Sequence, residues 1–423
     1  MKIKDQKLSN GLRFIEAPMP GTRTATVLVI YKTGSKYENR QTSGISHFVE
    51  HVMFKGTEKR PDAAIISSEL DSIGGEYNAF TSKEFTGYYI KADASKFSRA
   101  LEIISDMVTN SKFADEDINK ERGVIIEEAN MYDANPMMKI EDIFEQVLYG
   151  DTPAGWDTIG FKENIKTWTH QDFAKYFKAQ YGTNSATLVF AGNLPKDIKK
   201  QAEKFFSTLP KNKWQNKLAV KEKQSAPQVL AVNKKIEQTV FSLGVRTFKS
   251  GSKEEAAIKL LAVILGGSMS SRLFSEVREK RGLAYSVRAS VEFYSDCGYL
   301  TAVAGVKNEK LEEALLAVLE EFRKIKEEKI SKKEIKKAID LTSGRLAIQL
   351  EASDDVANWY GFQTILKKEI ISPEQFLKKI KSVTADDLQK VAKQIFQPKN
   401  LNLALIGPIK DQKKLLAILK KFK

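Results

Sequence analysis

The order of apolar and polar residues switches between the short runs typical of strands and the three-to-four-residue spacing typical of helices. In the first half, the pattern predicts a strand over Thr24–Lys32, helices over His47–Phe54 and Ala63–Ile73, strand residues within Tyr77–Ala92, and a helix over Ser95–Ser111. In the second half, it predicts a strand over Gln238–Val245, a helix over Lys253–Leu265, and two strands within Tyr285–Val306. Paired strands with helices between them favour α+β layers over a doubly wound parallel sheet.

The chain repeats itself at a spacing of 215 residues. The aligned pairs are Phe161 and Phe376, Ile165 and Ile380, Lys166 and Lys381, Thr169 and Thr384, Asp172 and Asp387, and Tyr181 and Phe396. Each block leads into an apolar strand that ends in glycine, Ala186–Gly192 and Leu401–Gly407. Duplication therefore predicts two homologous α+β domains, each an antiparallel-rich mixed sheet covered by helices.

The join between the two copies is predicted within Lys211–Pro227, which is rich in Lys, Asn and Gln and ends in Ser-Ala-Pro. Such a composition is typical of a linker. We therefore expect an N-terminal domain over residues 1–215, a linker over 216–227 and a C-terminal domain over 228–423.

A chain of 423 residues is too long for one hydrophobic core, in agreement with two domains. Its longest apolar stretches, such as Leu260–Leu265, are too short to span a bilayer, and Met1–Asn10 lacks the apolar core of a secretory signal. A single cysteine, Cys297, excludes an internal disulfide framework and suits a reducing compartment. We expect a cytoplasmic protein without a membrane partner.

The net charge of +14 raises the question of nucleic-acid binding. Most of the charge comes from lysines scattered over amphipathic helices, as in Lys307–Lys337, where Glu and Lys are interspersed at helical spacing. Such faces are usually solvated surface. Because arginine and aromatic residues are not interleaved, we expect no nucleic-acid partner.

Two of the three histidines, His47 and His51, lie four residues apart with Glu50 between them. On a helix this spacing puts both imidazoles on one face, where they can bind one ion, with Glu50 close enough to take a proton from a metal-bound water. The order H-x-x-E-H marks a class of zinc peptidases, whereas the alternative is two surface histidines on an ordinary helix. The second copy of this helix, Ile258–Ala262, contains no histidine, so metal chemistry is predicted in one half only.

A catalytic zinc ion takes three protein ligands and keeps one open position, so a third ligand is needed. The remaining histidine, His170, lies beside the N-cap of a repeated helix, and Ala385 stands at that place in the second copy. We therefore expect His170 to be an exposed residue near a helix cap, and a carboxylate to complete the site.

An acid-rich helix over Asp115–Asp133 offers that carboxylate. Glu121 and Glu128 are seven residues apart and share a face, whereas Glu127 points elsewhere. One of the pair could bind the metal while the other orients a histidine ligand, and the spacing leaves the assignment open. The alternative is that these are solvated charges on a surface helix.

Taken together, the sequence resembles the pitrilysin or inverzincin family of zinc metallopeptidases, most closely the branch of mitochondrial processing peptidase and its bacterial relatives. The resemblance covers nearly the whole chain and is most specific over Gly44–Thr57, Gly74–Thr81 and the pair Glu121-Arg122. It implies that each chain binds one Zn²⁺ through His47, His51 and Glu128. It also implies that Glu50 is the general base and that Glu121 is a second functional glutamate.

The resemblance also implies how a peptide substrate is held. The strand Glu76–Thr81 would bind the peptide backbone at its edge, with Asn78 and Ala79 as candidate contacts. Arg278 and Tyr285, seven residues apart in the C-terminal half, would grip the substrate near the scissile bond. The alternatives are ordinary turn-and-strand chemistry for the first pair, and a surface arginine with a core tyrosine for the second.

Larger members of the family fuse two such units into a closed chamber, so the resemblance implies a homodimer or a heterodimer with a paralogue. The expected function is that of a zinc metalloendopeptidase acting on unfolded or extended peptides. The alternative is a catalytically idle scaffold or partner subunit. Such relatives typically lack one or more motif residues, whereas this chain has all of them.

Overall fold

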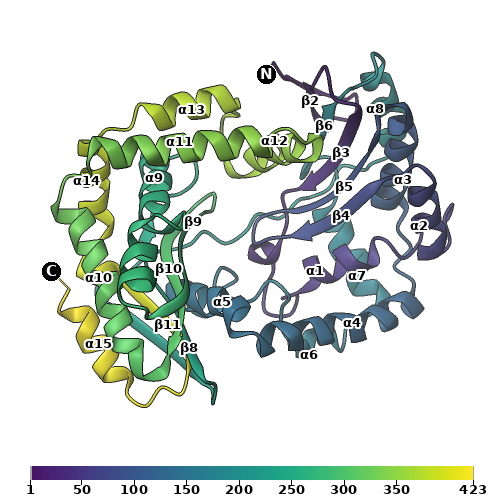
Figure 1. Ribbon diagram of the computed structural model, residues 1–423. Coiled ribbons are helices and arrows are strands. Elements are labelled where there is room, and N and C mark those ends of the chain that lie inside the picture. The colour runs from purple at the N-terminus through teal and green to yellow at the C-terminus, as the bar shows by residue number, and fades with distance from the viewer. Residues whose placement is uncertain (1, 423) are drawn as a thin grey trace. The chain divides into compact units, whose positions relative to one another are not determined.

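The computed structural model describes residues 2–422 and divides the chain into two compact units (Figure 1). The first unit contains the segments up to 130, 157–218 and 347–373, and the second contains 131–156, 219–346 and 374 onwards. The units therefore differ from the continuous stretches 1–215 and 228–423 in the expected domain organisation, because a segment of each half lies in the unit of the other half.

The exchanged segments each carry a helix that covers a sheet. Helix α5 (Pro136–Tyr149) buries Phe144 against the sheet of the second unit. Helix α12 (Ser353–Leu366) buries Ala357 and Tyr360 against the sheet of the first unit. An apolar helix face predicts that a helix packs on something, but it does not specify which of two similar sheets. The sequence pattern alone could not reveal this exchange.

The first unit is built on a six-stranded sheet in the order β1-β2-β6-β3-β5-β4. Only β2 and β6 pair in parallel, and the other neighbours are antiparallel. The strands are β1 (Lys4–Lys7), β2 (Arg13–Pro18), β3 (Thr24–Tyr31), β4 (Glu76–Thr81), β5 (Thr86–Asp93) and β6 (Ala186–Gly192). Strand β4 thus forms one edge of this sheet.

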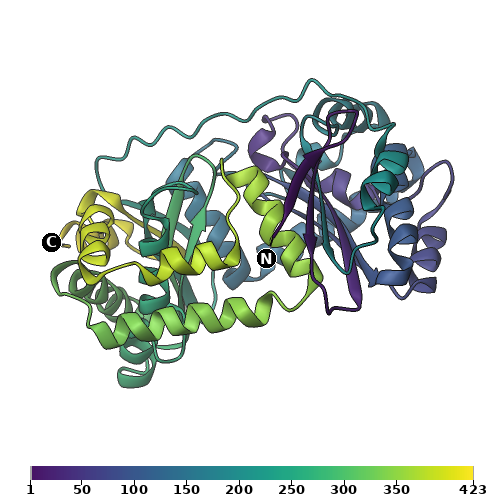
Figure 2. The same ribbon diagram turned by 90° about the horizontal axis from the view of Figure 1, so that it is seen from above.

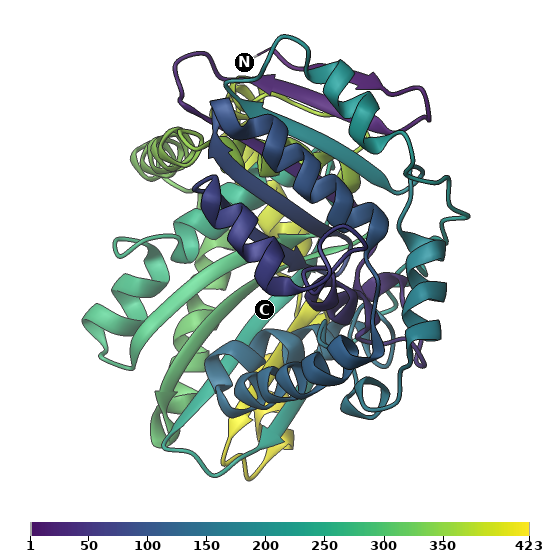
Figure 3. The ribbon, with the colours of Figure 1, turned by 90° about the vertical axis from the view of Figure 1, so that its right-hand side faces the viewer.

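The two faces of this sheet are buried by different helices. Helix α12 covers one face, and the large core on the other face includes residues of α1, α3 and α7, with α3 lying in front of the strands in Figure 3. The remaining helices of this unit lie around that core. Their bounds are α1 (Ile45–Val52), α2 (Ala63–Ser72), α3 (Phe97–Asn110), α4 (Asp115–Ala134), α6 (Lys162–Ile165), α7 (His170–Gln180) and α8 (Ile198–Phe206).

The second unit repeats this topology in a five-stranded sheet with the order β7-β11-β8-β10-β9. Here β7 and β11 form the parallel pair, and the remaining pairs are antiparallel. The strands are β7 (Gln228–Asn233), β8 (Gln238–Thr247), β9 (Ala284–Phe293), β10 (Gly298–Lys307) and β11 (Leu401–Gly407). The match in strand order confirms the predicted α+β class and the duplication.

Helices cover both faces of the second sheet as well. The bounds of those not yet given are α9 (Glu255–Gly266), α10 (Leu311–Glu327), α11 (Lys332–Gln349), α13 (Pro373–Lys381), α14 (Ala385–Ile395) and α15 (Gln412–Lys420), with a π-helix η3 (Phe274–Lys280) before β9. Helices α7 and α14, the repeated pair, both begin with a capping box, Thr169 with Asp172 and Thr384 with Asp387. Within residues 2–422, no helix has the length and apolar character needed to cross a bilayer.

Residues 207–227, which join β6 and α8 to the second sheet, contain no helix or strand and run in an extended path (Figure 2). The beginning of this segment is fixed to the first unit, because Trp214 Nε1 donates to the carbonyl of Lys32 at 2.7 Å. Further along, Gln224 accepts a hydrogen bond from Arg246 Nε within the second unit. Residues 207–227 are therefore held to the first unit near their start and to the second unit near their end.

Candidate metal centre

Helix α1 carries the H-x-x-E-H motif and begins where the backbone requires glycine. Its N-cap residue, Gly44, has a φ of 102°, and a Cβ there would lie 2.5 Å from the carbonyl oxygen of Ile159. The apolar residues of the helix are buried in the core of the first unit, so the motif's polar side chains lie on the opposite, partly exposed face. These are His47, Glu50 and His51.

The start of α1 is also held by a buried carboxylate, that of Glu38. Its two oxygens accept hydrogen bonds from the backbone N–H groups of Gly44, at 2.7 Å, and Ser46, at 2.8 Å. Burial raises the pKa of Glu38 to about 7, although these hydrogen bonds oppose the rise. Glu38 thus satisfies donors that the first turn of a helix leaves free, and it fixes the position of α1.

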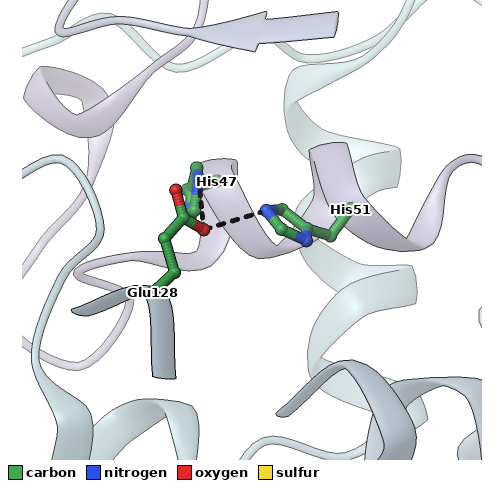
Figure 4. Close-up of side chains that lie close together, drawn as sticks. All are labelled: His47, His51 and Glu128. Carbon is green, nitrogen blue, oxygen red and sulfur yellow. Dashed lines mark ion pairs between the residues drawn. The ribbon is translucent and has the colours of Figure 1, made fainter. Parts of the chain in front are cut away.

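Glu128, on α4, faces both histidines (Figure 4). Its Oε2 lies 3.7 Å from His47 Nε2 and 3.4 Å from His51 Nε2. The two imidazole rings are 4.7 Å apart between centroids. In the described part of the chain, these three residues are the group whose ligand atoms all lie within 4.8 Å of one another.

The spacing of these atoms fits a tetrahedral zinc ion. Bonds of about 2.0–2.1 Å in a tetrahedral site place neighbouring ligand atoms about 3.3–3.5 Å apart. The separations of 3.4 and 3.7 Å from Glu128 to the two nitrogens are close to this value. Two nitrogens and one carboxylate oxygen leave a fourth position free, as a catalytic zinc site requires.

The two glutamates of α4 face different atoms of His51. Glu121 Oε2 lies 3.2 Å from His51 Nδ1, whereas Glu128 faces Nε2. The second oxygen of Glu121 accepts a hydrogen bond from Lys55 Nζ, with the two atoms 2.6 Å apart. Glu121 is therefore placed to orient the imidazole, and Glu128 to share a metal ion with it. The geometry thus distinguishes the roles of Glu121 and Glu128, which their spacing in the sequence leaves open.

The surroundings of the two imidazoles shift their pKa values in opposite directions. Burial and the neighbouring His51 lower the pKa of His47 to about 4. Burial also disfavours charge on His51, but the hydrogen bonds that its ring N–H groups donate to Glu121 and Glu128 outweigh this effect and raise the pKa of His51 to about 9. The carboxylates of Glu121 and Glu128 thus favour positive charge beside α1, and the same carboxylates would favour a bound cation.

Glu50 is held by a residue of the edge strand β4. Thr81, the last residue of that strand, donates a hydrogen bond from Oγ1 to Glu50 Oε2 at 2.7 Å. Burial raises the pKa of Glu50, and the hydrogen bond from Thr81 partly offsets that rise. Glu50 thus lies beside the histidines, with one of its oxygens fixed.

The candidate substrate contacts Asn78 and Ala79 also lie on β4, which packs against α1. Asn78 is exposed and Ala79 is half-buried. The backbone N–H of Ala79 donates to the side-chain oxygen of Asn78 at 2.9 Å. The structure therefore places both residues on the strand edge beside the metal cluster, as expected.

The other candidate substrate residues, Arg278 and Tyr285, belong to the second unit. Arg278 is in η3 and Tyr285 is in the edge strand β9. The guanidinium of Arg278 lies 4.9 Å from the centre of the Tyr285 ring, so the two side chains stack. Tyr285 is 82% exposed, which excludes the alternative of a core tyrosine.

Two further predictions concern residues outside the cluster. His170 is exposed at the start of α7, and its Nδ1 lies 2.8 Å from the carbonyl oxygen of Phe113, as expected for a residue near a helix cap. Glu127 is exposed and accepts a hydrogen bond from Asn130, away from the histidines. Neither residue belongs to the metal cluster.

Three residues near the cluster were not predicted from the sequence. Lys55 and Thr81 lie within the stretches that carry the family resemblance, so their position in those motifs was an available signal. Glu38 precedes α1 by several residues and offers no such signal, because capping residues are normally sought at the helix boundary itself.

The chain is similar to known proteins over nearly its whole length. The family described as Insulinase (Peptidase family M16) matches residues 13–160, and the domain described as Peptidase M16 inactive domain matches residues 167–341. An uncharacterized zinc protease of Streptomyces coelicolor is 32% identical over 417 residues, covering 97% of this chain and 90% of that protein. Another, of Bacillus subtilis, is 31% identical over 406 residues, covering 96% and 98%.

Solved structures extend the comparison to the fold. The crystal structure of a protease from Helicobacter pylori has a TM-score of 0.90 and 25% identity, covering 96% of this chain and 99% of that one. A peptidase M16 inactive domain from Pseudomonas fluorescens has a TM-score of 0.88 at 18% identity, covering 97% of this chain and 99% of that one. The class of protein is therefore that of the zinc metallopeptidases. Within that class, this chain belongs to peptidase family M16, the insulinase or pitrilysin-like family.

Proposed function

We propose that this protein is a zinc-dependent metalloendopeptidase that hydrolyses peptide bonds in unfolded or extended peptides. The observation that carries the proposal is the convergence of His47, His51 and Glu128 on one point, with Glu50 beside them on the same helix face. An idle scaffold subunit has no need of such a cluster, in which a general base lies next to a complete set of ligands.

The proposed chemistry assigns one task to each side chain. The two imidazoles and Glu128 would hold the ion, which when bound supplies Lewis acidity and lowers the pKa of a coordinated water to about 7. Glu50 accepts the proton of the attacking water and then delivers it to the leaving amine. Glu121 keeps the His51 ring oriented by accepting a hydrogen bond from Nδ1, so that Nε2 would be available to hold the ion.

The edge strand β4 is suited to binding a peptide backbone. The hydrogen bond from Ser82 N–H to the carbonyl of Phe85 marks a hydrogen-bonded pair at the end of the β4–β5 hairpin. Since such pairs alternate along an antiparallel ladder, Ala79 and Thr81 direct their backbone groups to the free edge of the sheet. The Ala79 N–H now donates to the side-chain oxygen of Asn78, and a carbonyl of a peptide added at this edge would take the place of that acceptor.

We further propose that Arg278 and Tyr285 contact the substrate. Their stacked side chains form an exposed pair, in which the guanidinium can donate to a peptide carbonyl and the phenol can donate to the developing oxyanion.

A cleavage assay with a quenched fluorescent peptide tests the proposed function, with and without a chelator and with zinc restored. We expect chelator-sensitive cleavage and about one zinc ion per chain. Glu50→Gln should retain zinc and lower kcat by about 10²–10⁴-fold, the usual contribution of a general base. Full activity of that variant at unchanged metal content would remove Glu50 from its role. A wild-type protein that binds zinc but cleaves nothing would favour the idle scaffold.

We also propose that the protein acts in the cytoplasm as a homodimer, or as a heterodimer with a paralogue, in which Arg278 and Tyr285 of one copy serve the metal site of the other. Mixing a Glu50→Gln subunit with a Tyr285→Phe subunit should then restore part of the activity. Mixtures that stay inactive although labelled subunits demonstrably exchange would contradict the trans arrangement.

A further inference from the structure

Thr81 connects the candidate general base, Glu50, with the strand edge that is proposed to bind the peptide. Its hydroxyl donates to Glu50 Oε2 at 2.7 Å, and its backbone belongs to the edge strand β4. In the ladder with β5, Thr81 stands opposite Thr86. The pairing pattern makes this a pair without mutual backbone hydrogen bonds, so the N–H and C=O of Thr81 face the free edge.

The side chain of Thr81 lies on the face of the strand that packs on α1. Alternate residues of a strand share a face, so Thr81 shares one with Tyr77 and Ala79, which pack against the core containing α1. Phe80 points to the other face, where its ring lies against Phe362 of α12. The Thr81 hydroxyl is therefore directed to Glu50 by the pleat of the strand, and its backbone is left available for a peptide.

We propose that Thr81 is a positioning residue that couples peptide binding on β4 to the orientation of the Glu50 carboxylate. The inference rests on the proposed function. A peptide that adds to β4 would order the end of this strand, and the ordered strand would hold one oxygen of Glu50 in place. The other oxygen remains free to accept the proton of the attacking water. Thr81 thus acts through Glu50 and does not touch the reacting atoms.

The test compares Thr81→Val, which keeps the shape but removes the hydroxyl, with Thr81→Ser, which keeps the hydroxyl. A hydrogen bond to a charged group contributes enough that we expect Thr81→Val to lower kcat by about 10- to 100-fold. KM should stay within about twofold because the backbone edge is intact, and zinc content should be that of the wild type. Thr81→Ser should recover most of kcat.

Thr86→Val is the matched control. Thr86 is the cross-strand neighbour of Thr81, but its hydroxyl donates to the carbonyl of Thr33 and does not contact Glu50. This variant should lose a hydroxyl from the same strand pair while kcat stays near the wild-type value. Equal losses of kcat in Thr81→Val and Thr86→Val would indicate general loosening of the hairpin and would overturn the proposal.

A second readout needs no activity. In the zinc-free protein, urea unfolding of Thr81→Val, Glu50→Ala and the double variant forms a double-mutant cycle. We expect the two changes to be non-additive, because each removes one partner of the same hydrogen bond. Additive effects on the free energy of unfolding would refute the inference about Thr81. A Thr81→Val variant with the kcat of an active wild-type protein would also refute it, and neither result would contradict the proposed function. If the wild-type protein shows no chelator-sensitive cleavage, the proposed function fails first.

Discussion

Helices α1 and α9 occupy equivalent places in the two sheets, yet their surfaces differ completely. Each follows the strand in the middle of its sheet and packs near the edge strand, β4 for α1 and β9 for α9. In α9 the residues at the place of the motif are Ile258, Leu261 and Ala262, and all three are buried. In α1 the same places hold two histidines and a glutamate.

The difference shows how a candidate metal site changes a helix that the same topology also accommodates without one. An apolar helix such as α9 gains stability by burying both sides. In α1, one side is left polar and partly buried, and polar groups there need partners. Those partners come from α4 and from Thr81, and Glu38 binds the backbone N–H groups at the start of the helix, so the candidate site involves several elements of the first unit. The second unit needs none of them.

Exchanging one residue between the two helices should have the largest effect. Leu261 is fully buried, so Leu261→Glu would place an unpaired charge in the core and lower the free energy of unfolding by about 3–5 kcal/mol. The converse change, Glu50→Leu, should leave stability equal or higher while abolishing cleavage. Urea unfolding of both variants measures the two changes in the free energy of unfolding. Equal destabilisation by both changes would contradict the difference proposed between the buried position in α9 and the partly exposed position in α1.

A change at Glu38 should alter the pH dependence of stability. Between pH 4.5 and about 7, the unfolded chain has lost the Glu38 proton while the folded protein keeps it, so this group lowers stability as pH rises. Glu38→Gln removes that contribution. The stability of the variant relative to wild type should therefore rise by about 3 kcal/mol across this window. Parallel unfolding curves for the two proteins from pH 4.5 to 7.5 would contradict the raised pKa.

The smallest expected effect concerns a feature that the two units share. Thr169→Ala and Thr384→Ala each remove the N-cap of a repeated helix, and each should cost about 1 kcal/mol. Thermal unfolding of the two variants should show similar decreases, because in both helices the aspartate at N3 accepts hydrogen bonds from the backbone N–H and the hydroxyl of the N-cap threonine. A cost confined to one of them would show that the repeated helices no longer contribute equally.

Local patterns in the sequence predicted most elements of the fold. The predicted helices at Ala63–Ile73 and Asp115–Asp133 agree with α2 and α4 within one residue at each end, and the strands that end the two copies have the predicted bounds. These features depend on side-chain periodicity and capping, which are local. The exchange of α5 and α12 depends on which sheet a helix meets, and no local pattern contains that information.

The candidate site was predictable to a similar extent. Spacing placed the two histidines on one face and paired Glu121 with Glu128, and the structure brings all four together. Spacing did not reveal the contacts of Thr81 and Glu38, since each joins residues from different elements whose approach is set by packing. Partners of that kind follow from tertiary structure alone.

The exchange of α5 and α12 has a consequence for the order in which the protein is made. During synthesis, the first sheet is complete once β6 has left the ribosome, but one of its faces stays bare until α12 follows, more than 150 residues later. The first half of the nascent chain therefore keeps apolar surface of its sheet exposed until α12 is synthesised. Neither half of the gene alone encodes all the helices that cover its sheet.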